Sequence, residues 1–350
     1  MIKLNRLSGL ITLILLGSLS ACNFSTNSPV PKPESTNHQL SSNLVALFLV
    51  KKDNIKNEFR GEVYPLALYI DGQYVDASND VTPQIHNNYE ASRIVQTNQS
   101  KSLLSAVRTF TAVDGAQLLG QFKVDQLGIS QFACSSLLVG QGQLTSERSL
   151  PALYDALPKE HAGGFSGSIG NRQLDESWRW AIAASHYNPL PAAQLPANLD
   201  EAKVKQDLLA LGEPLLTQVP KAATEATVVE TVSVFDLDHD GQPEVLGKLR
   251  KGVDQSVPPD RVKQSDGITV YANVWLSYKN QPTVIASEVT PYEYPVTRTP
   301  YTVAGTLDIN GDGTEEVIVK NNGYEATDFS IYQFNGTELK EVFKGAGYGC

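Results

Sequence analysis

Two short stretches of the chain place oxygen-bearing side chains at a spacing that suits a hard metal ion. The first reads DLDHDGQPE from Asp236 to Glu244, and the second reads DINGDGTEE from Asp308 to Glu316. Each has oxygen side chains at positions 1, 3, 5 and 9, with a glycine at position 6 that permits a sharp reversal of the backbone. Because Ca²⁺ takes several oxygen ligands in flexible geometry, it fits this pattern better than Mg²⁺ does.

The two loops therefore predict two structural calcium sites in the chain. The predicted ligands are Asp236, Asp238, Asp240, Glu244, Asp308, Asn310, Asp312 and Glu316. An ion in each loop would hold together strands whose clustered carboxylates otherwise repel one another. The alternative is that both segments are acidic turns that join strands and bind no ion.

Neither loop fits the EF-hand, which needs flanking helices and a glutamate at position 12. Position 12 is Gly247 in the first loop and Val319 in the second, and the flanking residues alternate as strands do. Each loop lies in a unit of strand, loop, strand, longer connection, strand, tight turn and strand. The predicted strands are Val228 to Phe235, Glu244 to Leu249, Ile268 to Tyr278 and Thr283 to Ser287, then Thr302 to Leu307, Val317 to Lys320, Phe329 to Phe334 and Glu338 to Phe343.

In the oxygen-bearing residues at positions 1, 3, 5 and 9 and the glycine at position 6, the loops resemble the FG-GAP or VCBS type of repeat found in integrin-like propellers. The resemblance implies calcium binding and a pair of four-stranded, propeller-blade-like units. Two units are too few to close a propeller, so a partial or fused β-sheet is an equal alternative. The first loop departs from the pattern at His239 and Pro243. The tail of the chain also resembles the ends of uncharacterised secreted bacterial proteins, which implies no activity.

The first 21 residues have the features of a secretory signal: a basic start, a short apolar run and small residues at the end. Residues Leu19 to Cys22 (LSAC) resemble the lipobox of bacterial lipoproteins, which implies acylation of Cys22 and removal of residues 1–21. Asn23 follows where an inner-membrane retention signal carries Asp, so the resemblance implies the outer membrane. The alternative is an ordinary cleaved signal with an incidental cysteine. Residues 22–43 are rich in Ser, Asn, Thr and Pro and predict a flexible tether.

The remaining chain is long enough for two domains, which we place at residues 44–195 and 196–350. We expect a mainly β fold with some α (α+β), built of antiparallel sheets. Asp71-Gly72 and Asp114-Gly115 lie between strand-like runs and predict tight hairpins in the first domain. The second domain opens with Asn198 to Glu201 followed by Ala202 to Leu216, which together predict a capped helix. Asp200 and Glu201 suit the dipole of its first turn, and Pro214 is expected to end or bend the helix. The net charge of −10 disfavours nucleic acid as a partner.

Two cysteines besides Cys22 remain in a compartment where disulfides persist. A bridge between Cys134 and Cys350 would tie the last residue of the chain back to the first domain. The alternative is a buried thiol at Cys134 and a free or intermolecular thiol at Cys350.

The residue patterns that suggest catalysis are incomplete. Residues Gly164 to Ser168 (GFSGS) approach a nucleophile elbow but end in Ser, and we expect a flexible loop there with an exposed His161. Zinc has no support, because the chain lacks paired Cys or His spacing. Asp175 and Glu176 are the carboxylates available for glycosidic chemistry, but adjacent residues of a strand point to opposite faces. The tryptophans are expected in the core rather than on a sugar-binding surface. They are Trp178, Trp180 and Trp275.

We therefore expect a non-enzymatic lipoprotein of the bacterial envelope, anchored by lipid and stabilised by calcium, that binds a protein or glycan partner or supports the envelope. The alternatives are a secreted hydrolase and a carbohydrate-binding protein, both using calcium structurally.

Overall fold

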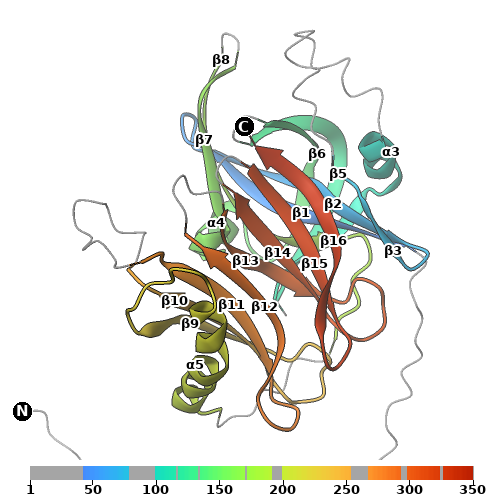
Figure 1. Ribbon diagram of the computed structural model, residues 1–350. Coiled ribbons are helices and arrows are strands. Elements are labelled where there is room, and N and C mark those ends of the chain that lie inside the picture. The colour runs from blue at the N-terminus through green and yellow to red at the C-terminus, as the bar shows by residue number, and fades with distance from the viewer. Residues whose placement is uncertain are drawn as a thin grey trace, which may run out of the picture. The chain divides into compact units, whose positions relative to one another are not determined.

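A computed structural model describes residues 42–78, 99–115, 117–132, 135–169, 172–190, 199–253, 267–292, 298–323 and 326–349 (Figure 1). The predicted signal, the predicted lipidation site at Cys22 and residues 22–41 of the predicted tether lie outside the described residues, as do Cys134 and Cys350. The tether was predicted to extend to residue 43, which is wrong at its end: Ser42 and Asn43 already belong to the first strand, where Asn43 is buried. Among the described residues, every helix is too short or too polar to cross a membrane.

Six strands of the first half pair in a closed ring, which forms a barrel. In ring order they are β1 (Ser42–Asp53), β2 (Glu58–Ile70), β6 (Ser135–Thr145), β5 (Gln117–Phe132), β4 (Thr109–Asp114) and β8 (Arg172–Ala184). Antiparallel pairing of β1 with β8 closes the ring. Two further strands extend it: β3 (Gln73–Asp76) pairs with β2, and β7 (Ala162–Ile169) pairs with β8. The helices α3 (Gln99–Ala106) and α4 (Leu150–Ala156) and the 3₁₀ turn η1 (Lys159–His161) complete this half.

The hairpin between β2 and β3 has the predicted tight turn. Ile70 pairs with Gln73, and the two residues between them, Asp71 and Gly72, have φ angles of 50° and 81°. Positive φ at both positions is the geometry of a type I′ turn, for which Asp-Gly is a preferred sequence. Asp114 likewise pairs with Gln117 across the second predicted hairpin.

The second half contains a helix and two four-stranded antiparallel sheets. The helix is α5 (Glu201–Thr217). The first sheet has the order β12 (Thr283–Pro291), β11 (Val270–Ser277), β10 (Glu244–Lys251) and β9 (Thr227–Phe235). The second has the order β13 (Arg298–Leu307), β14 (Glu316–Gly323), β15 (Ala326–Phe334) and β16 (Leu339–Gly349). The mainly β, antiparallel class is thus confirmed, and each predicted strand of this half has a counterpart.

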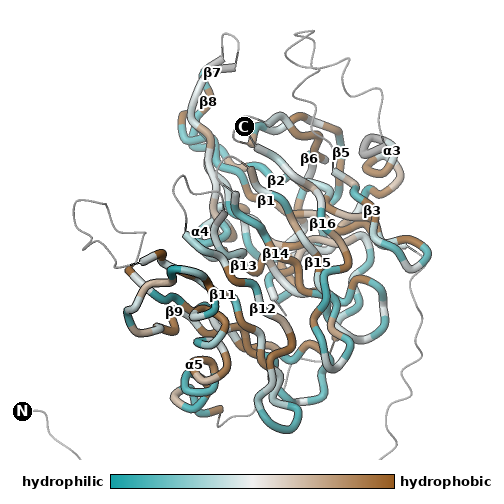
Figure 2. The backbone as a smooth tube through the Cα atoms, in the orientation of Figure 1, coloured by the Kyte–Doolittle hydropathy of each residue, from teal (hydrophilic) through white to brown (hydrophobic). Residues whose placement is uncertain are grey.

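Helix α5 covers the first sheet with one apolar face (Figure 2). The helix is capped, as predicted, and the cap is the Asp200 carboxylate, which accepts from the backbone N–H groups of Ala202 and Lys203. Pro214 lies inside the helix, and the helix continues to Thr217. Leu208 of the helix packs so close to Gly247 of β10 that a methyl group on Gly247 would overlap its side-chain carbons.

Gly247→Ala is therefore expected to destabilise the fold by about 1–3 kcal/mol, because the added carbon forces the helix away from the sheet. Chemical denaturation would measure the change. Ser233→Ala, an exposed position on the neighbouring strand β9, is the control and is expected to stay within about 0.5 kcal/mol of the parent. An unchanged midpoint for Gly247→Ala would contradict the close helix–sheet contact.

One hydrophobic core joins the last sheet to the barrel. It contains Leu47 and Leu49 of β1, Trp180 of β8, and Ile318 and Ile331 of the second sheet. The other face of β1 packs against the aromatic rings of β4 and β5. Burial on both faces explains why residues 44–50 form an uninterrupted apolar run. The boundary at 195/196 stays a prediction, but described residues on its two sides share this core.

The predicted loop at Gly164 to Ser168 is wrong. These residues lie within β7 and pair with β8, so that Phe165 is opposite Glu176. The expectation of an exposed His161 is also wrong, because this side chain is buried and stacks on Trp180 with ring centroids 5.4 Å apart. Close pairing with β8 favours glycine at this edge, since a methyl group on Gly163 would overlap the indole of Trp178.

The disulfide between Cys134 and Cys350 stays a prediction, because both residues lie outside the described ones. Their described neighbours are in contact: the Ser135 hydroxyl donates to the carbonyl of Gly349 and accepts from its N–H, both at 2.9 Å.

Candidate metal centre

The first acidic loop connects β9 to β10 and gathers three of its four predicted ligands. Single carboxylate oxygens of Asp236, Asp238 and Glu244 lie within 4.8 Å of one another. The backbone of the loop turns through left-handed conformations at His239 (φ 54°) and Gly241 (φ 82°), which brings position 9 back beside position 1. Among the described residues this is the one group of three or more acidic, His or Cys ligands close enough for a shared ion.

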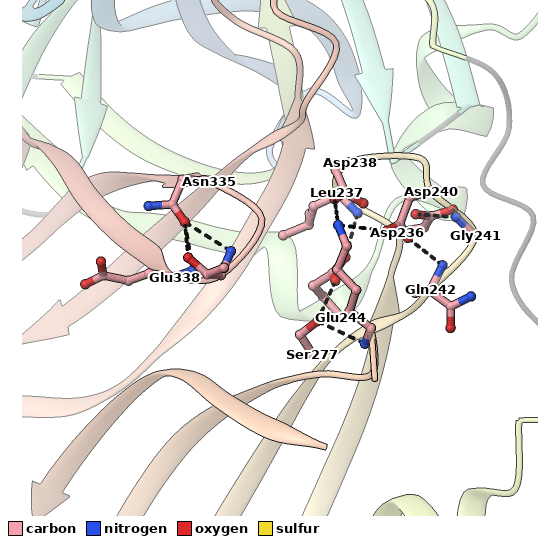
Figure 3. Close-up of polar contacts among 12 residues, drawn as sticks. Asp236, Leu237, Asp238, Asp240, Gly241, Gln242, Glu244, Ser277, Asn335 and Glu338 are labelled. Carbon is pink, nitrogen blue, oxygen red and sulfur yellow. Dashed lines mark hydrogen bonds and ion pairs between the residues drawn. The ribbon is translucent and has the colours of Figure 1, made fainter. Parts of the chain in front are cut away.

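Backbone and hydroxyl groups hold two of these carboxylates in place (Figure 3). The N–H of Leu237 donates to Glu244 Oε2 at 3.0 Å, and the Ser277 hydroxyl donates to Glu244 Oε1 at 3.3 Å. The N–H of Gly241 donates to Asp236. Since Glu244 begins β10 and Ser277 ends β11, the sheet itself fixes the position of Glu244.

Asp240, the fourth predicted ligand, lies apart from this group. Its Oδ2 forms an ion pair with Lys279 Nζ at 3.1 Å, and the same ammonium is 3.4 Å from Asp238 Oδ2. The N–H of Gln242 donates to Asp240 Oδ1. Lys279 thus partly neutralises the exposed side of the loop.

The buried side of the first loop has the electrostatics of a cation site. Asp238 Oδ1 is buried and has no hydrogen-bond partner among the residues that the structure describes. Burial raises the pKa of Glu244 to about 7, and the charges of Asp238 and Asp240 add to the effect. Burial also raises the pKa of Asp236. A divalent ion would supply the missing partner and lower these pKa values, so the residues of the first loop fit Ca²⁺.

The second loop connects β13 to β14 with similar backbone contacts. The N–H of Gly311 donates to Asp308 Oδ1 at 2.8 Å, and the N–H of Ile309 donates to Glu316 Oε2 at 2.8 Å. Here, however, a side-chain amide lies among the carboxylates: Asn310 Nδ2 is 3.0 Å from Asp312 Oδ2 and 2.8 Å from Glu316 Oε1. In this arrangement the NH₂ group of Asn310, a donor, lies between the carboxylates of the second loop, where a bound ion would need an oxygen acceptor.

The two loops touch one another. The N–H of Glu315 donates to the carbonyl of Leu237 at 2.8 Å, and Glu315 Oε1 is 3.9 Å from His239 Nε2. A cavity of about 260 Å³ lies beside this contact and is lined in part by Asp236 and Asp308. The first residues of the two acidic loops therefore face a common space.

The carboxylates and tryptophans that could act in catalysis or sugar binding have structural roles instead. Glu176 is buried and lies 2.8 Å from Lys51 Nζ and 2.7 Å from Arg60. Burial acts to raise its pKa, but the two cations outweigh burial and hold the pKa below its usual value, opposite to the need of a general acid. Asp175 accepts a hydrogen bond from Asn54.

The three tryptophans are buried, as expected, and form no sugar-binding surface. They are Trp178, Trp180 and Trp275.

A buried charged network around Lys51 was not anticipated from the sequence. It contains Lys51, Glu62 and Glu176, with Arg60 at its edge. Two features of the sequence indicate that these charges are buried. Lys51 directly follows the apolar run of β1, and Glu62 lies two residues before Tyr64, on the same face of β2.

Comparison of the chain with protein-family models, with curated proteins and with solved structures found no match.

Proposed function

We propose that this chain is a lipid-anchored protein of the bacterial envelope whose C-terminal β-sheets are stabilised by calcium. The observation that carries the proposal is the group of Asp236, Asp238 and Glu244, with a buried carboxylate oxygen that lacks a partner. The ion is structural in this proposal: it would fasten the end of β9 to the start of β10 and lower the repulsion within the loop.

The two four-stranded sheets support a relation to propeller blades. Both follow the order of the chain from one edge strand to the other, and both carry an acidic loop between their first two strands. A four-stranded antiparallel sheet of consecutive strands is the unit of a propeller blade. We propose that the pair is blade-like and related to FG-GAP or VCBS repeats.

A non-enzymatic role fits the residues of the described part of the chain. Of the two carboxylates weighed for glycosidic chemistry, Glu176 is paired with Lys51 and Arg60, and Asp175 accepts a hydrogen bond from Asn54. In this proposal the protein binds a protein or glycan partner or supports the envelope, and it does not use nucleic acid.

Calorimetric titration of Ca²⁺ into the full chain, purified in detergent and stripped of metal, tests the proposal. We expect saturable binding of Ca²⁺ and a higher melting temperature with the ion than with chelator. Asp236→Ala is expected to abolish binding in the first loop, while Asp175→Ala, a surface carboxylate outside both loops, leaves it unchanged. No heat of binding and no change in melting would refute calcium stabilisation.

The lipid anchor has its own test. Growth with a clickable fatty acid should label the protein, and Cys22→Ser should abolish the label and release the chain from the membrane fraction. Signal cleavage without label at Cys22 would instead identify an ordinary secreted protein.

A further inference from the structure

Position 3 differs between the two acidic loops, as Asp238 in the first and Asn310 in the second. We infer that the first loop holds the ion and that the second is closed by the side-chain amide of Asn310, which takes the place of a cation. This inference rests on the proposed function, because it assigns the calcium of that proposal to one loop. It also assigns the second loop a different task, that of fastening the last sheet to the barrel.

The contacts of Asn310 define its role. This side chain is 5% exposed, and its two amide hydrogens point at Asp312 Oδ2 and Glu316 Oε1. Its oxygen accepts from the N–H of Asp312 at 2.8 Å, which fixes the orientation of the amide: turned over, the NH₂ group would face another N–H donor. Asp238 in the first loop cannot donate, and its buried oxygen has no partner.

Protein donors also satisfy the other carboxylate oxygens of the second loop. The N–H groups of Gly311 and Gly313 donate to Asp308, at 2.8 and 3.2 Å. Asn188, which follows β8, donates to Asp308 Oδ2 at 3.2 Å, and Gln333 of β15 approaches Asp312 Oδ2 at 3.4 Å. The described donors from outside the first loop are the Ser277 hydroxyl, to Glu244, and the exposed Lys279, to the outer oxygens of Asp238 and Asp240.

The second loop is bound to the barrel through its backbone as well. The side chain of Asn43 on β1 donates to the carbonyl of Ile309 at 3.0 Å, and Ile309 itself is fully buried in the core shared with the barrel. Together with the bond from Asn188, these contacts attach the loop between β13 and β14 to the barrel. Because the donors of these bonds are protein groups, the attachment does not depend on a metal ion.

An ion in the second loop would have to displace the two hydrogen bonds of Asn310. Each of these hydrogen bonds is worth roughly a factor of three to ten in an equilibrium constant, and more where its acceptor is ionised. We therefore expect the second loop to bind Ca²⁺ at least about tenfold more weakly than the first. The first loop also has four carboxylates at the predicted ligand positions, against three in the second.

Calorimetry with exchanged residues tests the inference on the full chain in detergent, with Ca²⁺ as the titrant. The parent is expected to bind one ion. Asp236→Ala should abolish that binding, and Asp308→Ala should leave it. Asn310→Asp, which removes both amide bonds and adds a carboxylate, should create a second site. Asp238→Asn, which copies the second loop into the first, should weaken the parent site at least about tenfold. Circular dichroism confirms that each variant is folded.

The outcomes separate this inference from the proposal on which it rests. Two ions in the parent, one of them lost in Asp308→Ala, would overturn the inference and leave calcium stabilisation standing. A folded Asn310→Asp that still binds one ion would also overturn it. Absence of binding by the parent would defeat calcium stabilisation itself. Should Asn310→Asp not fold, the stoichiometry of the parent and of Asp308→Ala still decides.

Discussion

Lys51→Met is expected to lower the free energy of unfolding by about 3–5 kcal/mol, the usual cost of removing one partner from a buried ion pair. The Lys51 side chain is fully buried, 2.8 Å from Glu176 and 3.9 Å from Glu62. Its ammonium also donates to the Ser130 hydroxyl at 2.5 Å and lies over the rings of Phe132 and Trp178. Without it, two buried carboxylates would share the half-exposed Arg60 as their remaining cation.

Glu62 makes this loss large. Its Oε2 is buried and has no hydrogen-bond partner in the described part of the chain, so the nearby charge of Lys51 stabilises that oxygen. Adding Glu62→Gln to Lys51→Met restores a neutral network of Arg60 and Glu176, and we expect it to recover at least half of the lost stability. Urea denaturation of the parent, the single variant and the double variant measures both effects.

Lys52→Met is the matched control, because Lys52 is the next residue of β1 and is only half-buried. Its ammonium lies over the ring of Phe59, 5.7 Å from the centroid, and its loss should cost less than about 1 kcal/mol. Equal destabilisation by the two lysine variants would show that the buried network is not what stabilises this end of the barrel.

The strands of the second half could be predicted because each is short, alternates in polarity and ends at a turn with its own chemistry. The acidic loops and the turn at Asn335-Gly336 set the ends of the strands beside them to within one residue. The ends away from these turns were less accurate: β16 continues to Gly349, beyond the predicted Phe343. Helix α5 was equally clear from its Asp200 cap and its leucines. Such signals are local, so they survive in a single sequence.

The barrel could not be predicted, because its closure depends on pairing between β1 and β8, which are far apart in the chain. Local patterns carry no information on that partner. Strand β7 could not be distinguished from a loop for a related reason: its glycines look flexible alone, but Gly163 lies against the indole of Trp178 on β8, the strand with which β7 pairs.

The candidate site was found by spacing, but the difference between its two halves was not. Aspartate and asparagine both fit position 3 of a calcium loop in a sequence pattern. The structure shows which partners each one meets: a buried carboxylate oxygen without a donor at Asp238, and an amide with two acceptors at Asn310. That distinction depends on side-chain contacts rather than on residue type.

Without calcium, the protein is expected to become less stable as pH rises from about 5 to about 8. Burial raises the pKa of Glu244 from 4.5 to about 7 and that of Glu316 from 4.5 to about 8. The folded state therefore binds these protons more tightly than the unfolded state. The contribution of these two carboxyl groups to stability is fully present below pH 4.5 and is lost as pH rises through their folded pKa values. For Glu244 alone the loss is on the order of 3 kcal/mol.

Calcium should remove the part of this loss that comes from Glu244, because an ion beside the carboxylate stabilises its charged form and returns the pKa toward or below the unfolded value. Melting temperatures at about pH 5 and about pH 8, each with chelator and with Ca²⁺, measure the effect. Glu244→Gln, an isostere without a charge, should melt in chelator with a smaller pH dependence and gain little from calcium. If the chelated parent instead melted higher at pH 8 than at pH 5, Glu244 would be ionised without an ion, and the first loop would need no cation for its stability.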